Sequence, residues 1–184
     1  MRVSDTTATT SPSVPTYARL LRRSHDLIAQ DKGDSPEADA LAERMDRPWL
    51  ALSAQEQRRM RGLSADLHAL RAGGPKRVEM SPDRVADWQQ TARDTYARSE
   101  LGDADALLDF LRQPIPSNLP RHVVPFLQAK GWEALGDLET ALVFMREAER
   151  HEAEQRASVL SFLHRLGRAE DAALFGELHQ GYKS

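Results

Sequence analysis

Three Leu-Gly pairs place helix ends at similar intervals along the second half of this 184-residue chain. Leu101-Gly102, Leu135-Gly136 and Leu166-Gly167 each follow one stretch with helical apolar spacing and precede another, and their glycines lie 34 and 31 residues apart. Glycine often ends a helix because it adopts left-handed backbone without a steric penalty. Three such pairs at this spacing predict helix–turn–helix units that recur along the chain.

The first half of the chain has helical signals too, and no stretch alternates as a β-strand would. We expect a first helix that Gly33 stops, a second from Ser35-Pro36 to about Met45, and a third that starts at Ser53 and ends at Gly73. Ser53 and Glu56 have the spacing of a capping box. The predicted apolar stripes of the first and third helices are Tyr17, Leu20, Leu21, Leu27, Ile28, and Met60, Leu63, Leu67, Leu70. Trp49, Leu50 and Leu52 are expected to fill one end of this unit.

These signals divide the chain into four parts. Residues 1–15 are expected to form a disordered tail, because they are rich in Ser and Thr and lack an apolar segment. Residues 16–73 are expected to form a three-helix unit, 74–80 a connector, and 81–184 a region of helical repeats whose last helices span about 154–166 and 169–179. The predicted fold class is therefore all-α.

Composition excludes several classes of chemistry. The chain has no cysteine, which excludes disulfides, thiolate catalysis and Cys-based metal sites. No apolar run approaches the ~18 residues that span a bilayer, so we expect a cytoplasmic protein without a membrane partner. The net charge is −3, with residues 1–80 slightly basic and residues 81–184 acidic. Nucleic acid is therefore a disfavoured partner, because its binding depends on cationic side chains that neutralise phosphates.

The stretch around the second Leu-Gly pair resembles the tetratricopeptide repeat (TPR). That family has a 34-residue helix–turn–helix period, with small residues at fixed sites and a bulky aromatic in the first helix. The matching residues here are Ala129, Trp132, Leu135-Gly136, Ala141 and Ala148. The resemblance covers residues 85–180 approximately, and it departs from the family pattern at Pro125 and Leu107. It implies a short TPR-like α-solenoid after the three-helix unit.

The resemblance also implies where a partner would bind. In TPR proteins the first helix of each repeat lines the concave groove. The resemblance therefore implies that the corresponding positions of this chain line a binding groove: Gln89, Arg93, Tyr96, Lys130, Glu133, Ser161, His164 and Arg165. The carboxylate clamp of chaperone-tail-binding members is not matched, because its positions hold Ala92, Tyr96, Phe126 and Lys130. We therefore expect a non-enzymatic scaffold or adaptor without a cofactor, which binds a peptide or partner helix of another protein and could also self-associate.

A basic cluster supports a second hypothesis. Arg58, Arg59 and Arg61 lie close together on the predicted third helix, and they could contact phosphates or a regulator if this helix were a recognition helix. Glu56 and Asp66 lie nearby, which favours a solvated, mixed-charge helix face instead.

Two other patterns contain residue types that are found in catalytic or metal sites. His151 shares a predicted helix face with Glu147 and Glu154, so a metal-assisted enzyme is a third hypothesis, although Gln155 replaces the second histidine of H-E-x-x-H. Ser24-His25-Asp26 has the letters of a catalytic triad, but consecutive helical residues point about 100° apart. We therefore predict no catalytic, cofactor or metal residue.

Overall fold

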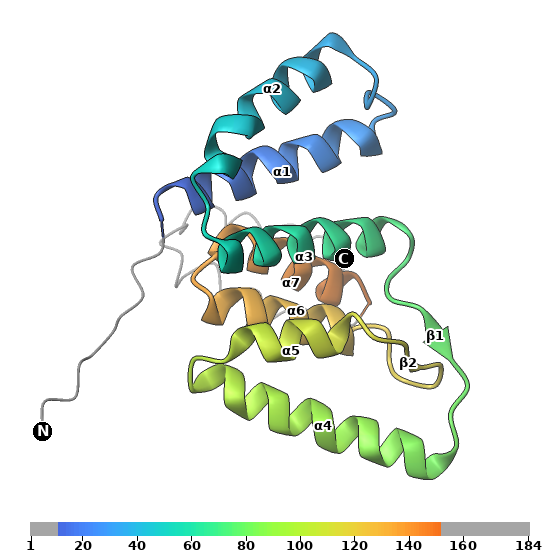
Figure 1. The fold of residues 1–184 in the computed structure, drawn as a ribbon. Coiled ribbons are helices and arrows are strands. Elements are labelled where there is room, and N and C mark those ends of the chain that lie inside the picture. Colours follow the sequence, from blue (N-terminus) through green and yellow to red (C-terminus); the bar gives the residue numbers. More distant parts are fainter. Residues whose placement is uncertain (1–10, 152–184) are drawn as a thin grey trace, which may run out of the picture. The chain divides into compact units, whose positions relative to one another are not determined.

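The computed structural model describes residues 11–151. This part of the chain is mostly helical, with seven helices and one pair of two-residue strands (Figure 1). Contacts divide the chain into two compact units, Met1–Gly73 and Gly74–Ser184. The predicted helices at 154–166 and 169–179, the third Leu-Gly pair and residues 1–10 of the predicted tail lie outside the described residues.

The first unit contains three helices, α1 (Ser13–Ala29), α2 (Pro36–Leu50) and α3 (Ala54–Arg71). Helix α1 packs against both α2 and α3. Leu20, Leu27 and Leu41 form a buried cluster between α1 and α2. The tail prediction is wrong for residues 13–15, which already belong to α1. Pro15 is compatible with a helix there because the first turn has no intrahelical partner for its missing N–H.

The predicted capping box is present at the start of α3. The Ser53 hydroxyl accepts the backbone N–H of Glu56 at 3.3 Å, and the Glu56 carboxylate accepts the N–H of Ser53 at 2.8 Å. The other carboxylate oxygen accepts the backbone N–H of Ser11 at 2.9 Å. These N–H groups of Ser11 and Ser53 lower the pKa of Glu56. Glu56 therefore bonds both to the start of α3 and to the backbone two residues before α1.

Two helix ends in this unit differ from the prediction. Helix α1 stops before Gly33, because Asp31 takes the left-handed conformation with φ 56° and the N–H of Lys32 returns to the Leu27 carbonyl. Helix α2 continues past Met45 and through Pro48, which costs it one backbone hydrogen bond near its end. The sequence signals for both ends were local, and packing overrode them.

The three residues that were expected to fill one end of this unit, Trp49, Leu50 and Leu52, pack only partly as expected. Trp49 stacks against Tyr17 with ring centroids 5.2 Å apart, and Leu52 is buried. Leu50, however, is 80% exposed, so its predicted role in filling the unit is wrong. Ile28 is 40% exposed although its neighbour Leu27 is buried in the cluster, because successive helical residues point in different directions.

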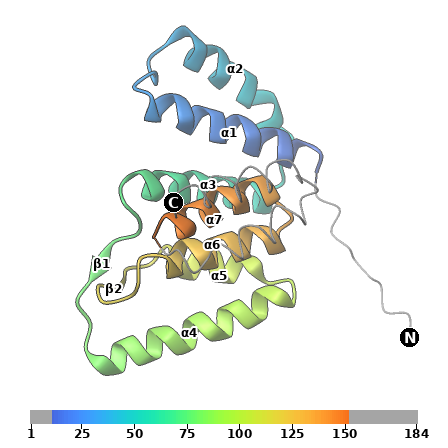
Figure 2. The same ribbon diagram turned by 180° about the vertical axis from the view of Figure 1, so that it is seen from behind.

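The second unit contains two consecutive helical hairpins. Helices α4 (Pro82–Glu100) and α5 (Ala104–Leu111) form the first, and α6 (Val123–Ala134) and α7 (Leu138–His151) form the second. Both views of the ribbon show these four helices side by side in chain order (Figures 1 and 2). Helix α6 contacts α4, α5 and α7, so it lies at the centre of the unit.

The two hairpins turn in the same way. Gly102 and Gly136 have φ values of 100° and 78°, in the region where a side chain would be strained. The N–H of Asp103 bonds to the Arg98 carbonyl, and the N–H of Asp137 bonds to the Trp132 carbonyl. Each glycine N–H bonds to the carbonyl three residues earlier, which completes a Schellman motif in both turns. The first two Leu-Gly pairs therefore end helices as predicted.

A short parallel strand pair corrects the all-α prediction. Strand β1 (Arg77–Val78) pairs with β2 (Ile115–Pro116), so the segment predicted as a connector is bonded to the loop after α5. The guanidinium of Arg77 also donates to the carbonyls of Ser117 and Leu119, at 3.2 and 2.6 Å. Two residues are too few to give an alternating sequence signal.

The residues that carried the repeat pattern are buried in the second unit. Ala129, Trp132, Ala141 and Ala148 have no exposed surface, so the alanines lie at helix contacts and Trp132 fills the core. A second cluster joins α4, α5 and α6 through Trp88, Ala92, Leu107, Leu111, Ile115 and Val124. At Gly131 the helices approach most closely, since an added Cβ would lie 2.8 Å from Cδ2 of Leu108.

Replacing the Ser53 cap is expected to destabilise the first unit. Ser53→Ala removes the acceptor for the Glu56 N–H, and a lost N-cap hydroxyl costs about 1 kcal/mol. The matched control is Ser81→Ala, because Ser81 precedes α4 without making a side-chain cap bond. Urea denaturation followed by circular dichroism should detect the loss in Ser53→Ala alone. Equal losses in both variants would contradict the role of the Ser53 hydroxyl.

Gly131→Ala is expected to destabilise the second unit. Alanine gains about 1 kcal/mol over glycine inside a helix. The new methyl group, however, would overlap Cδ2 and Cγ of the buried Leu108, at 2.8 and 2.9 Å, and overpacking costs about 1–3 kcal/mol. The overlap should dominate. In a Leu108→Ala background the same change should instead stabilise the unit, and a loss of similar size in both backgrounds would show that the two side chains are not coupled.

Candidate functional site

A groove of about 510 Å³ lies between α4 and α6 in the second unit. Helix α4 provides one wall, helix α6 the opposite one, and the loop before α6 closes one end. The lining side chains are mostly apolar: Trp88, Ala92, Tyr96, Leu119, Pro120, Val123, Phe126 and Leu127, with Gln89 and Arg93 as the polar members. The volume falls in the range of ligand pockets, about 300–1,000 Å³.

Helical periodicity places these residues on the groove walls. Trp88, Ala92 and Tyr96 are spaced by four residues, so they share one face of α4. Gln89 and Arg93 follow them one position later and form the polar edge. On α6, Val123, Phe126 and Leu127 have the same kind of spacing. Ala92 is the smallest of these lining side chains, and its size leaves space between the flanking aromatic rings.

The closed end of the groove depends on a contact distant in sequence. Leu119 and Pro120 lie in the loop between β2 and α6. The guanidinium of Arg77 holds this loop through the Leu119 carbonyl, while the N–H of Ser117 bonds to the Val78 carbonyl at 2.8 Å. The strand pair and Arg77 therefore shape one wall of the groove without lining it.

Three of the predicted groove residues line this groove, and two lie beside it. Gln89, Arg93 and Tyr96 are lining residues. Lys130 and Glu133 do not line the groove, and they form an ion pair with each other one turn apart on α6. Ser161, His164 and Arg165 lie outside the described residues. Leu119 and Pro120 were not predicted, because the position of an irregular loop does not follow from a repeat period.

Arg93 and Tyr96, at the polar edge of the groove, both interact with neighbouring side chains. Arg93 donates to Oε1 of Gln90 at 2.9 Å, across one turn of α4. Burial raises the pKa of Tyr96, and the negative charges of Glu100 and Glu133 raise it further. Tyr96 therefore stays a neutral hydrogen-bond donor near neutral pH, and it lies close enough to Glu133 to connect the groove with the ion pair.

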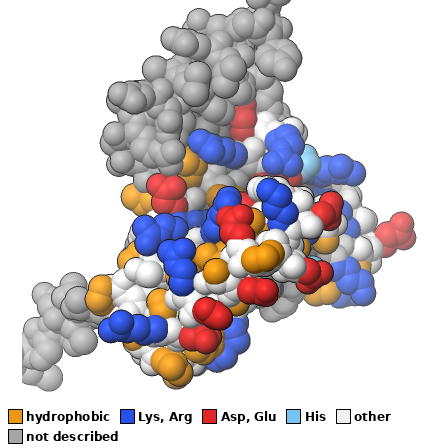
Figure 3. All heavy atoms as spheres, turned by 90° about the horizontal axis from the view of Figure 1, so that it is seen from above, with side chains coloured by type: hydrophobic (Ala, Val, Ile, Leu, Met, Phe, Trp, Pro, Cys, Tyr) orange, Lys and Arg blue, Asp and Glu red, His pale blue; other side chains and the backbone are white. Residues whose placement is uncertain are grey.

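The arginine cluster of α3 is largely engaged within the first unit. The guanidinium of Arg61 lies 5.3 Å from the Trp49 ring centroid, in a cation–π contact. The charge of Arg59 contributes to the lowered pKa of Glu56. On the face that Figure 3 shows, Asp and Glu side chains are interspersed with Lys and Arg side chains. Arg59 and Arg61 therefore have intramolecular interactions that an incoming phosphate would have to replace.

The structure pairs His25 with a serine other than Ser24. Nε2 of His25 lies 3.2 Å from Oγ of Ser64 on α3. Nδ1 is buried without a hydrogen-bond partner, so no carboxylate orients the ring as a triad requires. Burial lowers the pKa of His25, and the positive charges of Arg71 and His68 lower it further.

His151 contacts only part of its predicted cluster. Its Nε2 lies 3.1 Å from Oε1 of Glu147, and Arg150 pairs with the same glutamate at 2.7 Å. Glu154 lies outside the described residues. Across residues 11–151, no three His, Asp or Glu side chains gather in a way that could hold a metal ion.

Comparison with protein-family models, curated proteins and solved structures finds no match to the chain. Within the described part of the chain, every helix is too short or too polar to cross a membrane. Any function must therefore be argued from the site itself.

The stability of the first unit is expected to fall at acidic pH because of His25. Its lowered pKa means that the unfolded chain binds this proton more readily, so its contribution is complete above the ordinary value of about 6.5 and decreases as the pH falls below it. Urea denaturation between about pH 5 and 8 should show a shallower pH dependence for His25→Gln than for the wild type. His122→Gln, which removes a histidine of the second unit that does not act on His25, should keep the steeper slope; equal slopes in all three proteins would contradict the assignment.

Proposed function

We propose that this chain is a non-enzymatic protein-interaction module that binds a peptide or partner helix in the groove between α4 and α6. The observation that carries the proposal is the groove itself, whose walls are apolar along both helices. An apolar concavity of this size with a few polar side chains at its edge is the usual form of a binding site. The partner that fits it best is an amphipathic helix or a short apolar peptide, whose shape is complementary to the groove.

The arrangement of the hairpins supports a TPR-like reading of the second unit. Helices α4 and α6 are the first helices of consecutive hairpins, and the two turns have the same hydrogen bonds. In a TPR array the first helices line the binding groove, so a groove between α4 and α6 is where the resemblance would place one. The units are unequal, because α5 has 8 residues and α7 has 14. We therefore propose a divergent, short array.

Aromatic and aliphatic contacts would supply most of the affinity. Burying one Leu or Phe side chain of a partner contributes about 1.5–3 kcal/mol. Phe126 and Tyr96 are partly exposed and offer apolar surface for such anchors. Gln89 and Arg93 are exposed at the edge, where they could fix the direction of the partner through hydrogen bonds. Two or three anchors with this edge are consistent with a micromolar module.

The enzymatic and nucleic-acid hypotheses have weaker support. His151 has Glu147 as its one carboxylate partner among the described residues, and Arg61 and Arg59 already interact with Trp49 and Glu56. The α4–α6 groove has no comparable competing use within the described residues, since its apolar surface faces an open cavity. A partner helix would remove that surface from water.

Peptide selection followed by groove substitutions tests the proposal. A random peptide library displayed on phage should yield binders with apolar residues at helical spacing. Phe126→Ala should weaken the selected peptides at least about tenfold, the loss of about 1.4 kcal/mol expected for a removed anchor. Leu101→Ala is the matched control, because Leu101 is 88% exposed and does not line the groove.

Two further variants compare the loop that closes the groove with the ion pair beside it. Arg77→Gln should weaken peptide binding although Arg77 does not line the groove, because the change releases the loop that carries Leu119 and Pro120. Charge reversal at Lys130 and Glu133 should change binding less than Phe126→Ala, since these side chains lie beside the groove. If the peptides bind Phe126→Ala and Arg77→Gln as tightly as they bind the wild type, the groove proposal is wrong.

A further inference from the structure

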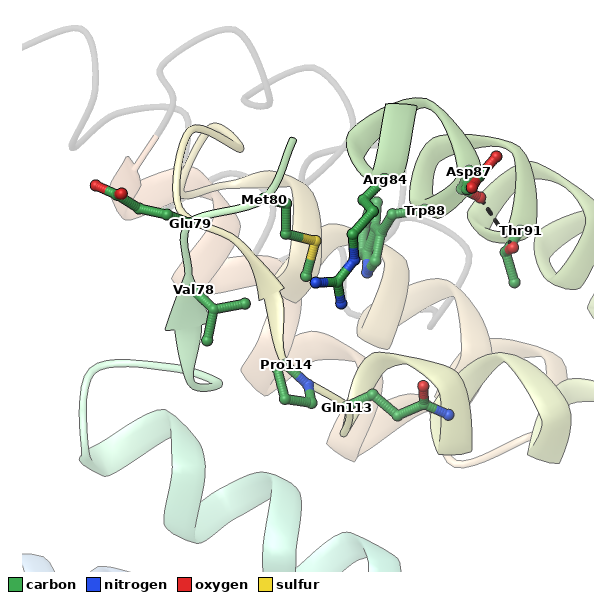
Figure 4. Close-up of a pocket in the computed structure, with 9 residues that line it drawn as sticks. All are labelled: Val78, Glu79, Met80, Arg84, Asp87, Trp88, Thr91, Gln113 and Pro114. Carbon is green, nitrogen blue, oxygen red and sulfur yellow. Dashed lines mark hydrogen bonds between the residues drawn. The ribbon is translucent and has the colours of Figure 1, made fainter. Parts of the chain in front are cut away.

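A second cavity lies on the other side of Trp88 from the groove. Its volume is about 520 Å³, and it is bounded by the chain from Val78 to Met80, the N-terminal half of α4 and the residues that follow α5 (Figure 4). Trp88 is the one side chain that the two cavities share among their lining residues. None of the residues nominated from the sequence lines this second cavity.

The indole N–H of Trp88 lacks a hydrogen-bond partner. Trp88 is only 8% exposed, and its Nε1 is buried without an acceptor. Figure 4 shows this nitrogen on the side of the ring that faces the cavity. A buried donor without an acceptor is unfavourable, because it has given up its hydrogen bond to water. An acceptor that reached Nε1 through the cavity would recover this loss.

A cationic donor lies one turn away on the same helix face. Arg84 precedes Trp88 by four residues, which places the two side chains next to each other. Arg84 is exposed, and it makes no hydrogen bond or ion pair with the described residues. Figure 4 shows its guanidinium among the lining residues, toward the side chain of Met80. The cavity therefore presents two kinds of N–H donor and no acceptor already paired with them.

The charges around the cavity restrict the anion that it could hold. Glu79 and Asp87 also belong to the lining, but Figure 4 shows both carboxylates pointing away from the guanidinium. One arginine with two carboxylates nearby favours a singly charged anion over a doubly charged phosphate. Val78, Met80 and Pro114 supply an apolar wall beside the donors.

We propose that this cavity binds a monocarboxylate carried on an apolar group. The carboxylate accepts hydrogen bonds from the Arg84 guanidinium and the Trp88 indole N–H, and the apolar group packs against Val78, Met80 and Pro114. Planar guanidinium and carboxylate groups match each other in a bidentate arrangement. The exposed Arg84 side chain has the freedom to turn toward the ligand and to uncover Nε1.

This carboxylate could belong to a free organic acid or to the C-terminus of a peptide. Both present the same chemistry to Arg84 and Trp88, so the experiment must separate them. The site and the α4–α6 groove share Trp88 but can be tested separately, because Arg84 lines only the site and Phe126 lines only the groove. Failure of one proposal therefore leaves the other standing.

Nuclear magnetic resonance of the ¹⁵N-labelled full chain tests the site directly. The chain has three tryptophans, so three indole N–H signals are expected, and the variants Trp49→Phe and Trp132→Phe identify the one from Trp88 by elimination. Hexanoate should shift the Trp88 signal in a saturable way at millimolar concentration. Hexanamide, which has the same apolar chain without the charge, should not shift it, and inorganic phosphate should bind more weakly than hexanoate.

Matched arginine variants provide the second readout. Arg84→Gln should raise the dissociation constant of hexanoate at least about tenfold, whereas Arg146→Gln, at an exposed arginine of α7 away from the cavity, should leave it unchanged. Acetyl-Ala-Val with a free carboxyl end and its C-terminal amide distinguish the two sources. Tighter binding of the free peptide than of hexanoate identifies a peptide terminus, and the reverse order identifies a free acid.

Four results would overturn the proposal. The Trp88 signal could stay in place with hexanoate up to about 10 mM, an affinity too weak for a built site. Hexanamide could shift it as strongly as hexanoate, or phosphate could bind more tightly than either. Finally, Arg84→Gln could bind hexanoate as well as the wild type does, which would remove the guanidinium from the site.

Discussion

The close approach of α5 and α6 at Gly131 sets the spacing of the second unit. A Cβ at this position would lie less than 3 Å from Cδ2 and Cγ of Leu108, so glycine lets α6 pack against this side chain without displacing it. Helix α6 contacts α4 and α7 as well, and its position therefore fixes one wall of the groove. Gly131 faces Leu108 of α5, whereas Phe126 and Leu127 of the same helix line the groove.

Trp88 has a second structural role that links the two candidate sites. It belongs to the buried cluster of α4, α5 and α6, and its ring lies 5.2 Å from that of Phe110. It also lines both cavities. A ligand that reorients this ring in one cavity would change the wall of the other. The groove and the proposed carboxylate site are thus separate in their chemistry but share one structural element.

The features that the sequence predicted well are those set by local interactions. The Ser53 capping box, the two Leu-Gly turns and the buried Ala129, Trp132, Ala141 and Ala148 depend on residues within about one helical turn or on helical period. Gln89, Arg93 and Tyr96 reach the groove for the same reason, because helix spacing alone places them next to Trp88 and Ala92.

The features that it missed depend on contacts between distant residues. The strand pair joins residues 77–78 to 115–116, and the Arg77 bond to Leu119 crosses 42 positions. Neither has a signal in a local window. The continuation of α2 through Pro48 opposes the local signal of proline, and Trp49 packs against Tyr17 from another helix. At Ser81 the residue type favours a cap, but the hydroxyl makes no such bond.

The Arg77 contact has a consequence for how the groove forms during folding. Loop closure across this many residues is entropically costly, and such non-local contacts are usually made late. Helices α4, α5 and α6 can each begin to form from nearby residues, whereas the wall at Leu119 and Pro120 needs β1 and β2 to meet. A chain with all its helices but without this contact would have an incomplete groove, so the ability to bind a partner would arise only at the last step of folding.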